Sequence, residues 1–316
     1  DRLLTRNLSG AAMLWSAEDG TLLHRLNDEL PHLAAQIGTL GGLRGGPMMA
    51  TSALREPETS RDSNLLTILG ASDLQIVDAH DAQLVARVET ELPSMAQAID
   101  ATNTQLATSL LGVGIVIVFD LSSGEETARF EGFSGQLLDL EFSPDGGEVL
   151  AGIMDGTARI LDVKTNEIRL TLEGHDGFLF SATYNRDGTR VLTAAGDNTA
   201  RLWDAATGEN LATFKGHANF GQDARFSPDE RRVMTVSADG SIKVWDLEGN
   251  ELMSFAGGSQ PTFAVWTPDG SRIVSSWADG KIRVFNSVPW DELAQIGDDE
   301  TPFEQRLSEW RGRENR

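Results

Sequence analysis

Two histidine–aspartate pairs are the residues of this chain whose types and spacing could support chemistry. His175 stands as far before Asp197 as His217 stands before Asp239. A histidine that a carboxylate orients can act as a general base, so each pair resembles part of a catalytic site. However, the spacing occurs twice within a longer pattern that also repeats. We therefore expect the pairs to belong to a repeated structural unit rather than to an active site.

Other combinations that would indicate an enzyme are absent from the sequence. There is no phosphate-binding Gly-x-x-x-x-Gly-Lys-Ser/Thr loop and no Gly-x-Ser-x-Gly nucleophile. None of the five histidines pairs with another at metal-ligand spacing. Asp139 and Asp223 could face a central channel and hold a metal ion, but two carboxylates without partner histidines are weak evidence. We expect no catalytic residue, no metal ligand and no cofactor.

The composition is that of an acidic globular protein. Its 316 residues include 48 acidic and 26 basic ones, which gives a net charge of −22. Such a surface repels phosphate groups, which argues against nucleic-acid and membrane-surface partners and favours a basic protein or peptide. The chain has no cysteine, which excludes disulfides and thiol catalysis and fits a cytoplasmic location. Arginine strongly outnumbers lysine, a bias that indicates a bacterial source.

A unit of about 41 residues recurs along most of the chain, and a repeat of this length is typical of a propeller blade. Its clearest copies, 174–204 and 216–246, begin at a Gly-His pair and end at a Trp-Asp pair. Pro-Asp-Gly and Asp-Gly sequences separate runs of apolar residues, as tight turns between antiparallel strands require. Each unit is therefore predicted to form one four-stranded sheet.

The repeat divides the chain into units, some of which match the repeated pattern more closely than others. Clear copies occupy residues 131–172, 173–214, 215–255 and 256–296, and weaker copies occupy 27–88 and 89–130. In the copy at 27–88, strands are expected at 48–54, 65–69, 74–77 and 83–88. Residues 1–26 align with the second, third and fourth strands of a unit whose first strand would lie upstream. The tail, 297–316, has apolar residues at helical spacing and is predicted to be a short helix.

On these motifs, residues 1–296 resemble the WD40-repeat family, strongly over 133–296 and weakly before that. The resemblance implies an all-β fold, a seven-bladed β-propeller of four-stranded antiparallel blades whose first blade lacks its innermost strand in this chain. Members of the family serve as interaction platforms, and almost none is itself an enzyme.

The resemblance also implies a structural role for the histidine–aspartate pairs. Many blades of the family contain a buried hydrogen-bond chain of Asp, His, Ser or Thr, and Trp. The matching residues are His217, Ser237, Asp239 and Trp245 in one unit, and His175, Asp197 and Trp203 in the unit before it. In that earlier unit, Ala195 stands where the serine would be.

Propellers of this family bind partners mostly on the face that carries the loops from fourth to first strand and from second to third strand. Apolar residues at these loops are candidates for partner binding, although each could equally pack between blades. The candidates are Phe133, Met154, Phe220 and Trp277.

We therefore expect a non-catalytic interaction, scaffold or sensing module of a larger bacterial protein, with an upstream domain in the same polypeptide. Its partner would be a protein or peptide. Two alternatives remain open. The chain could be a structural subunit of a multi-protein complex, held through an insertion at 27–47 and the tail, or a metal-dependent propeller enzyme.

Overall fold

The computed structural model describes residues 2–6, 12–16, 22–25, 65–69, 73–78 and 84–287, and these residues form β-strands and turns without a helix. Within these ranges no helix exists that could cross a bilayer. The predicted tail helix, the insertion at 27–47 and the strand expected at 48–54 lie outside the described residues.

Four sheets each contain four antiparallel strands in chain order. They are β7 (Ser94–Ile99), β8 (Gln105–Leu110), β9 (Ile115–Asp120) and β10 (Glu126–Glu131); β11 (Leu137–Phe142), β12 (Glu148–Ile153), β13 (Ala158–Asp162) and β14 (Glu167–Leu172); β15 (Leu179–Tyr184), β16 (Arg190–Ala195), β17 (Thr199–Asp204) and β18 (Asn210–Lys215); and β19 (Gly221–Phe226), β20 (Arg232–Ser237), β21 (Ser241–Asp246) and β22 (Glu251–Ala256).

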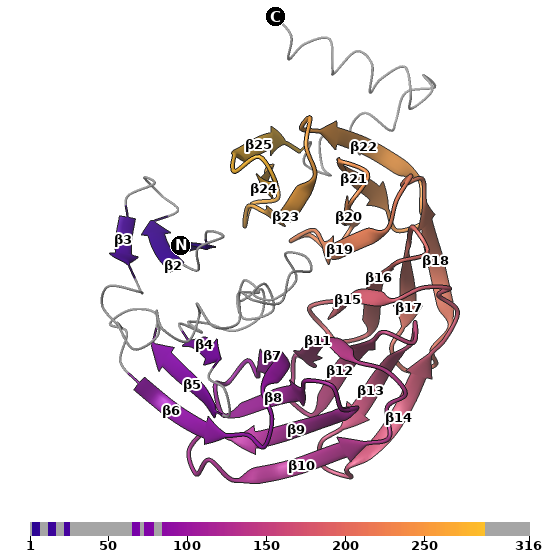
Figure 1. Ribbon diagram of the computed structural model, residues 1–316. Coiled ribbons are helices and arrows are strands. Elements are labelled where there is room, and N and C mark those ends of the chain that lie inside the picture. The colour runs from indigo at the N-terminus through magenta and orange to yellow at the C-terminus, as the bar shows by residue number, and fades with distance from the viewer. Residues whose placement is uncertain are drawn as a thin grey trace, which may run out of the picture.

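Three further sheets have three described strands each. They are β1 (Arg2–Arg6), β2 (Ala12–Ser16) and β3 (Leu22–Arg25); β4 (Leu65–Leu69), β5 (Asp73–Asp78) and β6 (Leu84–Glu89); and β23 (Pro261–Trp266), β24 (Arg272–Trp277) and β25 (Ile282–Asn286). The sheets follow one another around a common centre, with the first strand of each four-stranded sheet innermost and its fourth strand at the periphery (Figure 1).

The Pro-Asp-Gly sequences form the turns that were expected of them. Between β11 and β12, the N–H of Gly146 donates to the carbonyl of Ser143 at 2.9 Å, and Gly146 has a φ of 73°. The Asp145 carboxylate accepts from the N–H of Gly147 at 3.0 Å and from the Ser143 hydroxyl at 2.7 Å. Asp187 accepts in the same way from the N–H of Thr189 in the next sheet. These aspartates are therefore explained by the turn chemistry of the repeat.

The second strand of each four-stranded sheet is buried along nearly its whole length. In β12 and β16 every residue after the first is buried, and in β20 all six are. Continuous burial of this kind arises where a sheet is covered on both faces. The outer strand β14 instead begins with three exposed residues. Burial thus falls from the centre of the molecule to its periphery.

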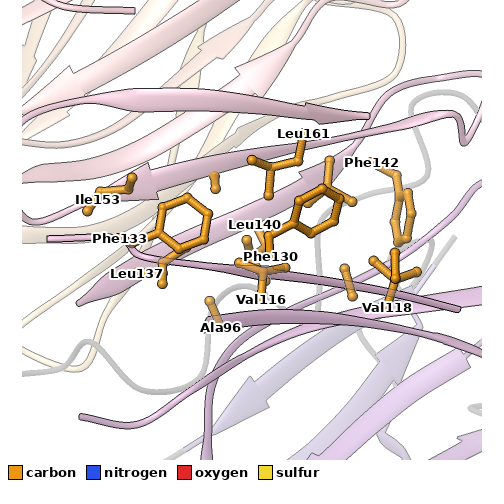
Figure 2. Close-up of a cluster of buried hydrophobic side chains, with 14 residues drawn as sticks. Ala96, Val116, Val118, Phe130, Phe133, Leu137, Leu140, Phe142, Ile153 and Leu161 are labelled. Carbon is orange, nitrogen blue, oxygen red and sulfur yellow. The ribbon is translucent and has the colours of Figure 1, made fainter. Parts of the chain in front are cut away.

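The hydrophobic core is divided into clusters, and each lies between two consecutive sheets. One cluster joins β7–β10 to β11–β14, and Figure 2 shows Phe130, Leu140, Phe142 and Val118 within it. Corresponding clusters join β4–β6 to β7–β10, β11–β14 to β15–β18, β15–β18 to β19–β22, and β19–β22 to β23–β25. Packing face to face between successive sheets is the organisation of a propeller.

The strands of the weaker upstream copies lie where the repeat placed them. The four strands expected within 89–130 correspond to β7–β10, and those expected at 65–69, 74–77 and 83–88 correspond to β4–β6. Near the N-terminus, Leu3 pairs with Trp15 in the same register as Val191 with Trp203. The strands β1, β2 and β3 therefore form the three-stranded sheet that the alignment predicted.

We expect Leu140→Ala to lower the free energy of unfolding by about 2–5 kcal/mol, because it leaves a cavity in the cluster of Figure 2. Urea unfolding followed by tryptophan fluorescence measures this loss. Leu211→Ala is the matched control, since Leu211 is 45% exposed and its truncation should cost far less. Equal losses in the two variants would contradict the packing described here.

Candidate functional site

His217 is the centre of a hydrogen-bond chain within the sheet β19–β22. Its Nδ1 lies 2.9 Å from the Asp239 carboxylate, and its Nε2 lies 2.7 Å from the hydroxyl of Thr235. The indole N–H of Trp245 donates to the same hydroxyl at 2.8 Å. An indole can only donate, so the Thr235 hydroxyl accepts from Trp245, and its own proton can be donated to Nε2 of His217. The lowered pKa of His217 assigns the neutral imidazole, which accepts at Nε2 and donates from Nδ1 to Asp239.

The preceding sheet, β15–β18, repeats the arrangement. His175 lies 2.8 Å from Asp197 through Nδ1 and 2.8 Å from the Thr193 hydroxyl through Nε2. Trp203 donates to Thr193 at 2.8 Å. Both nitrogens of each histidine are thus engaged inside the sheet, and the side chains of His175 and His217 are only 1% and 3% exposed, so neither ring is open to a substrate.

The hydroxyl of the chain comes from threonine, which corrects the assignment of Ser237. Ser237 lies two residues beyond Thr235 in β20, so both side chains point to the same face of the strand. Ser237 instead bonds to backbone groups, with its Oγ 2.9 Å from the carbonyl of Asn219 and 3.1 Å from the N–H of Asp239. Thr193 supplies the equivalent hydroxyl in the earlier sheet, so Ala195 leaves no gap there.

The burial of these chains determines their protonation. Burial lowers the pKa of His175 and of His217 and outweighs the opposing effect of the neighbouring aspartates. Burial would raise the pKa of Asp239, but hydrogen bonds from Ser241, the N–H of Ala218 and His217 together lower it to about 2. The ground state is therefore a neutral histidine beside an ionised aspartate.

Trp277 performs a related structural role in the sheet β23–β25, so its assignment as an exposed partner-binding residue is wrong. It is 3% exposed, and its indole N–H donates to the Ser275 hydroxyl at 2.7 Å. A Cβ on Gly257 would lie 2.6 Å from the indole, so glycine is needed at that position. A tryptophan from the second strand thus replaces the third-strand tryptophan of β17 and β21, and Phe285 stands at that third-strand place here.

Phe133 is also buried, which corrects its assignment to the partner-binding surface. It lies in the cluster of Figure 2 with Ala151 and Leu161, and Arg159 lies over its ring at 5.2 Å. In the repeat these three apolar residues occupy the places of His175, Thr193 and Trp203. The sheet β11–β14 therefore fills this space by apolar packing instead of by hydrogen bonds.

The remaining two candidates for partner binding are partly exposed at the surface. Met154 and Phe220 are both partly exposed, at the turn after β12 and in the loop before β19. The Phe220 ring centroid lies 5.4 Å from that of Phe180, which sequence reasoning did not single out.

Phe178 is the exposed residue that sequence reasoning missed. It lies in the loop between β14 and β15 and is 50% exposed, while its carbonyl accepts from the N–H of Gly196 at 2.8 Å. Phe178 follows His175 by the same interval as Phe220 follows His217. The recurrence of phenylalanine at this position of two consecutive repeats was the sequence signal that could have identified Phe178.

The two acidic residues considered for a channel metal site instead connect neighbouring sheets. Asp139 in β11 accepts from the N–H of Ala182 in β15 at 2.9 Å. Asp223 in β19 accepts from the Ser181 hydroxyl at 3.0 Å and from Arg225 at 2.8 Å. Among the described residues, no group of three or more His, Asp or Glu side chains is arranged to hold a metal ion.

Comparison with known families identifies the repeat. The family model for the WD domain, G-beta repeat, matches residues 166–204, 208–246 and 249–286. Three WD40 repeats follow one another in this chain. Each match begins with the outer strand of one sheet and continues through the first three strands of the next, so a WD40 repeat spans two sheets here. A search of curated proteins found no match.

We expect Thr235→Val to lower the free energy of unfolding by about 2–4 kcal/mol, because His217 and Trp245 both lose their partner in a buried place. Thr235→Ser, which keeps the hydroxyl, should retain most of the stability. Urea unfolding of the two variants provides the measurement. A valine variant as stable as the serine variant would contradict the hydrogen-bond chain.

The lowered pKa values of His175 and His217 predict a loss of stability in mild acid. Below about pH 6.5 the unfolded chain binds protons that the native imidazoles do not, so the free energy of unfolding falls as the pH falls. NMR titration of the imidazole signals tests whether the pKa values of the two histidines are lowered in the native protein. The titration midpoints of both histidines should lie below 6.5, and a midpoint above 6.5 for either would contradict it.

Proposed function

We propose that this chain is a non-catalytic protein-interaction platform built as a seven-bladed propeller, with the seven described sheets as its blades. WD40 repeats generally mediate protein–protein interaction, and three of them occur here. The histidines that resembled catalytic groups are engaged in structural hydrogen bonds. These observations support binding rather than catalysis.

The observation that carries the proposal is the exposure of aromatic side chains at one end of the sheets. Strand direction alternates along each sheet, so the fourth-to-first and second-to-third loops lie at the same end, which we call the loop face. Phe178 and Phe220 lie in such loops. Half-exposed aromatic residues are enriched at protein interfaces, where they supply much of the binding energy.

The loop face also suits a basic partner. The described loops at this end carry one lysine against seven acidic residues, which are Glu91, Asp155, Glu173, Asp176, Asp197, Asp239 and Asp279. Complementary charge speeds association and sets the orientation of partners. A basic protein surface or peptide is therefore the partner that this face fits best.

We expect a photo-crosslinking amino acid in place of Phe178 to form adducts with a partner protein in cells that produce the chain. The same group in place of Leu211, an exposed residue of the outer strand β18, is the matched control. Mass spectrometry of the adducts identifies the partner. Adducts at 211 but not at 178 would refute binding at the loop face.

A further inference from the structure

Phe180 and Phe220 form an aromatic pair on the loop face, and the exposed Phe178 lies two residues before Phe180. We call these three residues the aromatic cluster. The rings of Phe180 and Phe220 are 5.4 Å apart and tilted by 39°. A Cβ on Gly196 would lie 3.3 Å from the N of Phe178 and 3.7 Å from the Phe180 ring, so both residues border this glycine. The cluster therefore joins the edges of two neighbouring sheets, β15–β18 and β19–β22.

The hydrogen-bond chains hold this aromatic cluster in position. His175 anchors the loop that ends at Phe178, and the N–H of Asp176 donates to Asp197 at 3.1 Å. The carbonyl of Phe220 accepts from the N–H of Ala238 at 3.1 Å. Because these loops are ordered before any partner arrives, binding loses little conformational entropy.

Elsewhere, the protein repeatedly places a cation between an aromatic ring and a carboxylate. Arg225 lies 4.6 Å from the centroid of Phe263 and donates to Asp223 at 2.8 Å. Arg283 lies 4.9 Å from the ring of Trp277 and forms an ion pair with Asp279 at 2.7 Å. The alkyl part of such a side chain packs on the ring, and its charge is attracted by both partners.

The aromatic cluster offers rings and an exposed carboxylate close by in the chain, but none of its rings has a cation over it. The described lysines and arginines with a position over a ring lie over Phe133, Trp203, Trp245, Phe263, Trp266 and Trp277, and over none of the three clustered rings. Exposed Asp176 lies two residues before Phe178. The place is therefore suited to a cationic side chain from another molecule.

We propose that the aromatic cluster binds an arginine or lysine side chain of the partner protein, with the alkyl stem on the phenyl rings and the charge toward Asp176. This inference rests on the proposed function, because it names the group that the loop face recognises. A purely apolar side chain would gain nothing from the surrounding carboxylates, and an acidic one would be repelled.

Fluorescence anisotropy with three labelled peptides tests the proposal on the full chain. The peptides share a glycine–serine background and carry arginine, uncharged norleucine or glutamate at the same central positions. We expect binding of the arginine peptide alone, with affinity that falls as salt rises. Phe178→Ala and Asp176→Asn should each weaken it about threefold to tenfold.

Leu211→Ala and Glu209→Gln are the matched controls, because both residues are exposed and lie away from the loop face. Neither change should alter binding. Equal binding of the norleucine peptide, or equal losses in the control variants, would overturn the proposal. If position 178 still crosslinks to a partner while the arginine peptide fails to bind, recognition of a cation is wrong and the proposed function stands.

Discussion

Burial of the middle strands on both faces is the constraint on which the structure depends. Strands such as β12, β16 and β20 are buried on both faces, so a single sheet cannot keep their apolar side chains from water. Each sheet must therefore pack against the next, and five clusters of buried side chains provide this contact. The packing of the sheets also determines the positions of the loops at their ends.

Successive sheets fill equivalent space in different ways. Two sheets use the chain of Asp, His, Thr and Trp, in which every buried polar group has a partner. The sheet β11–β14 uses Phe133 and Leu161, and β23–β25 uses Trp277 with Ser275. A space in which every buried polar group is hydrogen-bonded and a space filled only by apolar groups both avoid the free-energy cost of a buried polar atom without a partner. This equivalence explains why the motif is lost in some sheets while the fold continues.

Turn chemistry made most of the strands predictable from the sequence. Pro-Asp-Gly and Asp-Gly adopt the few backbone conformations that a tight hairpin permits, so the strands between them are confined to short ranges. The hydrogen-bond chain was predicted less completely. Ser237 was chosen over Thr235, because a shared face of a strand does not reveal which side chain reaches the imidazole. Phe133 and Trp277 were placed at the surface because their loops lie there.

The sequence by itself determined the repeat, the turns and the order of strands, since these depend on residues close together in the chain. It also determined the acidity of the protein. Only the tertiary structure decided which aromatic residue of each loop faces water. Phe178 is half exposed and Phe133 is buried, although both lie in loops between sheets. Their difference depends on the side chains that the neighbouring sheet presents, and those come from distant parts of the chain.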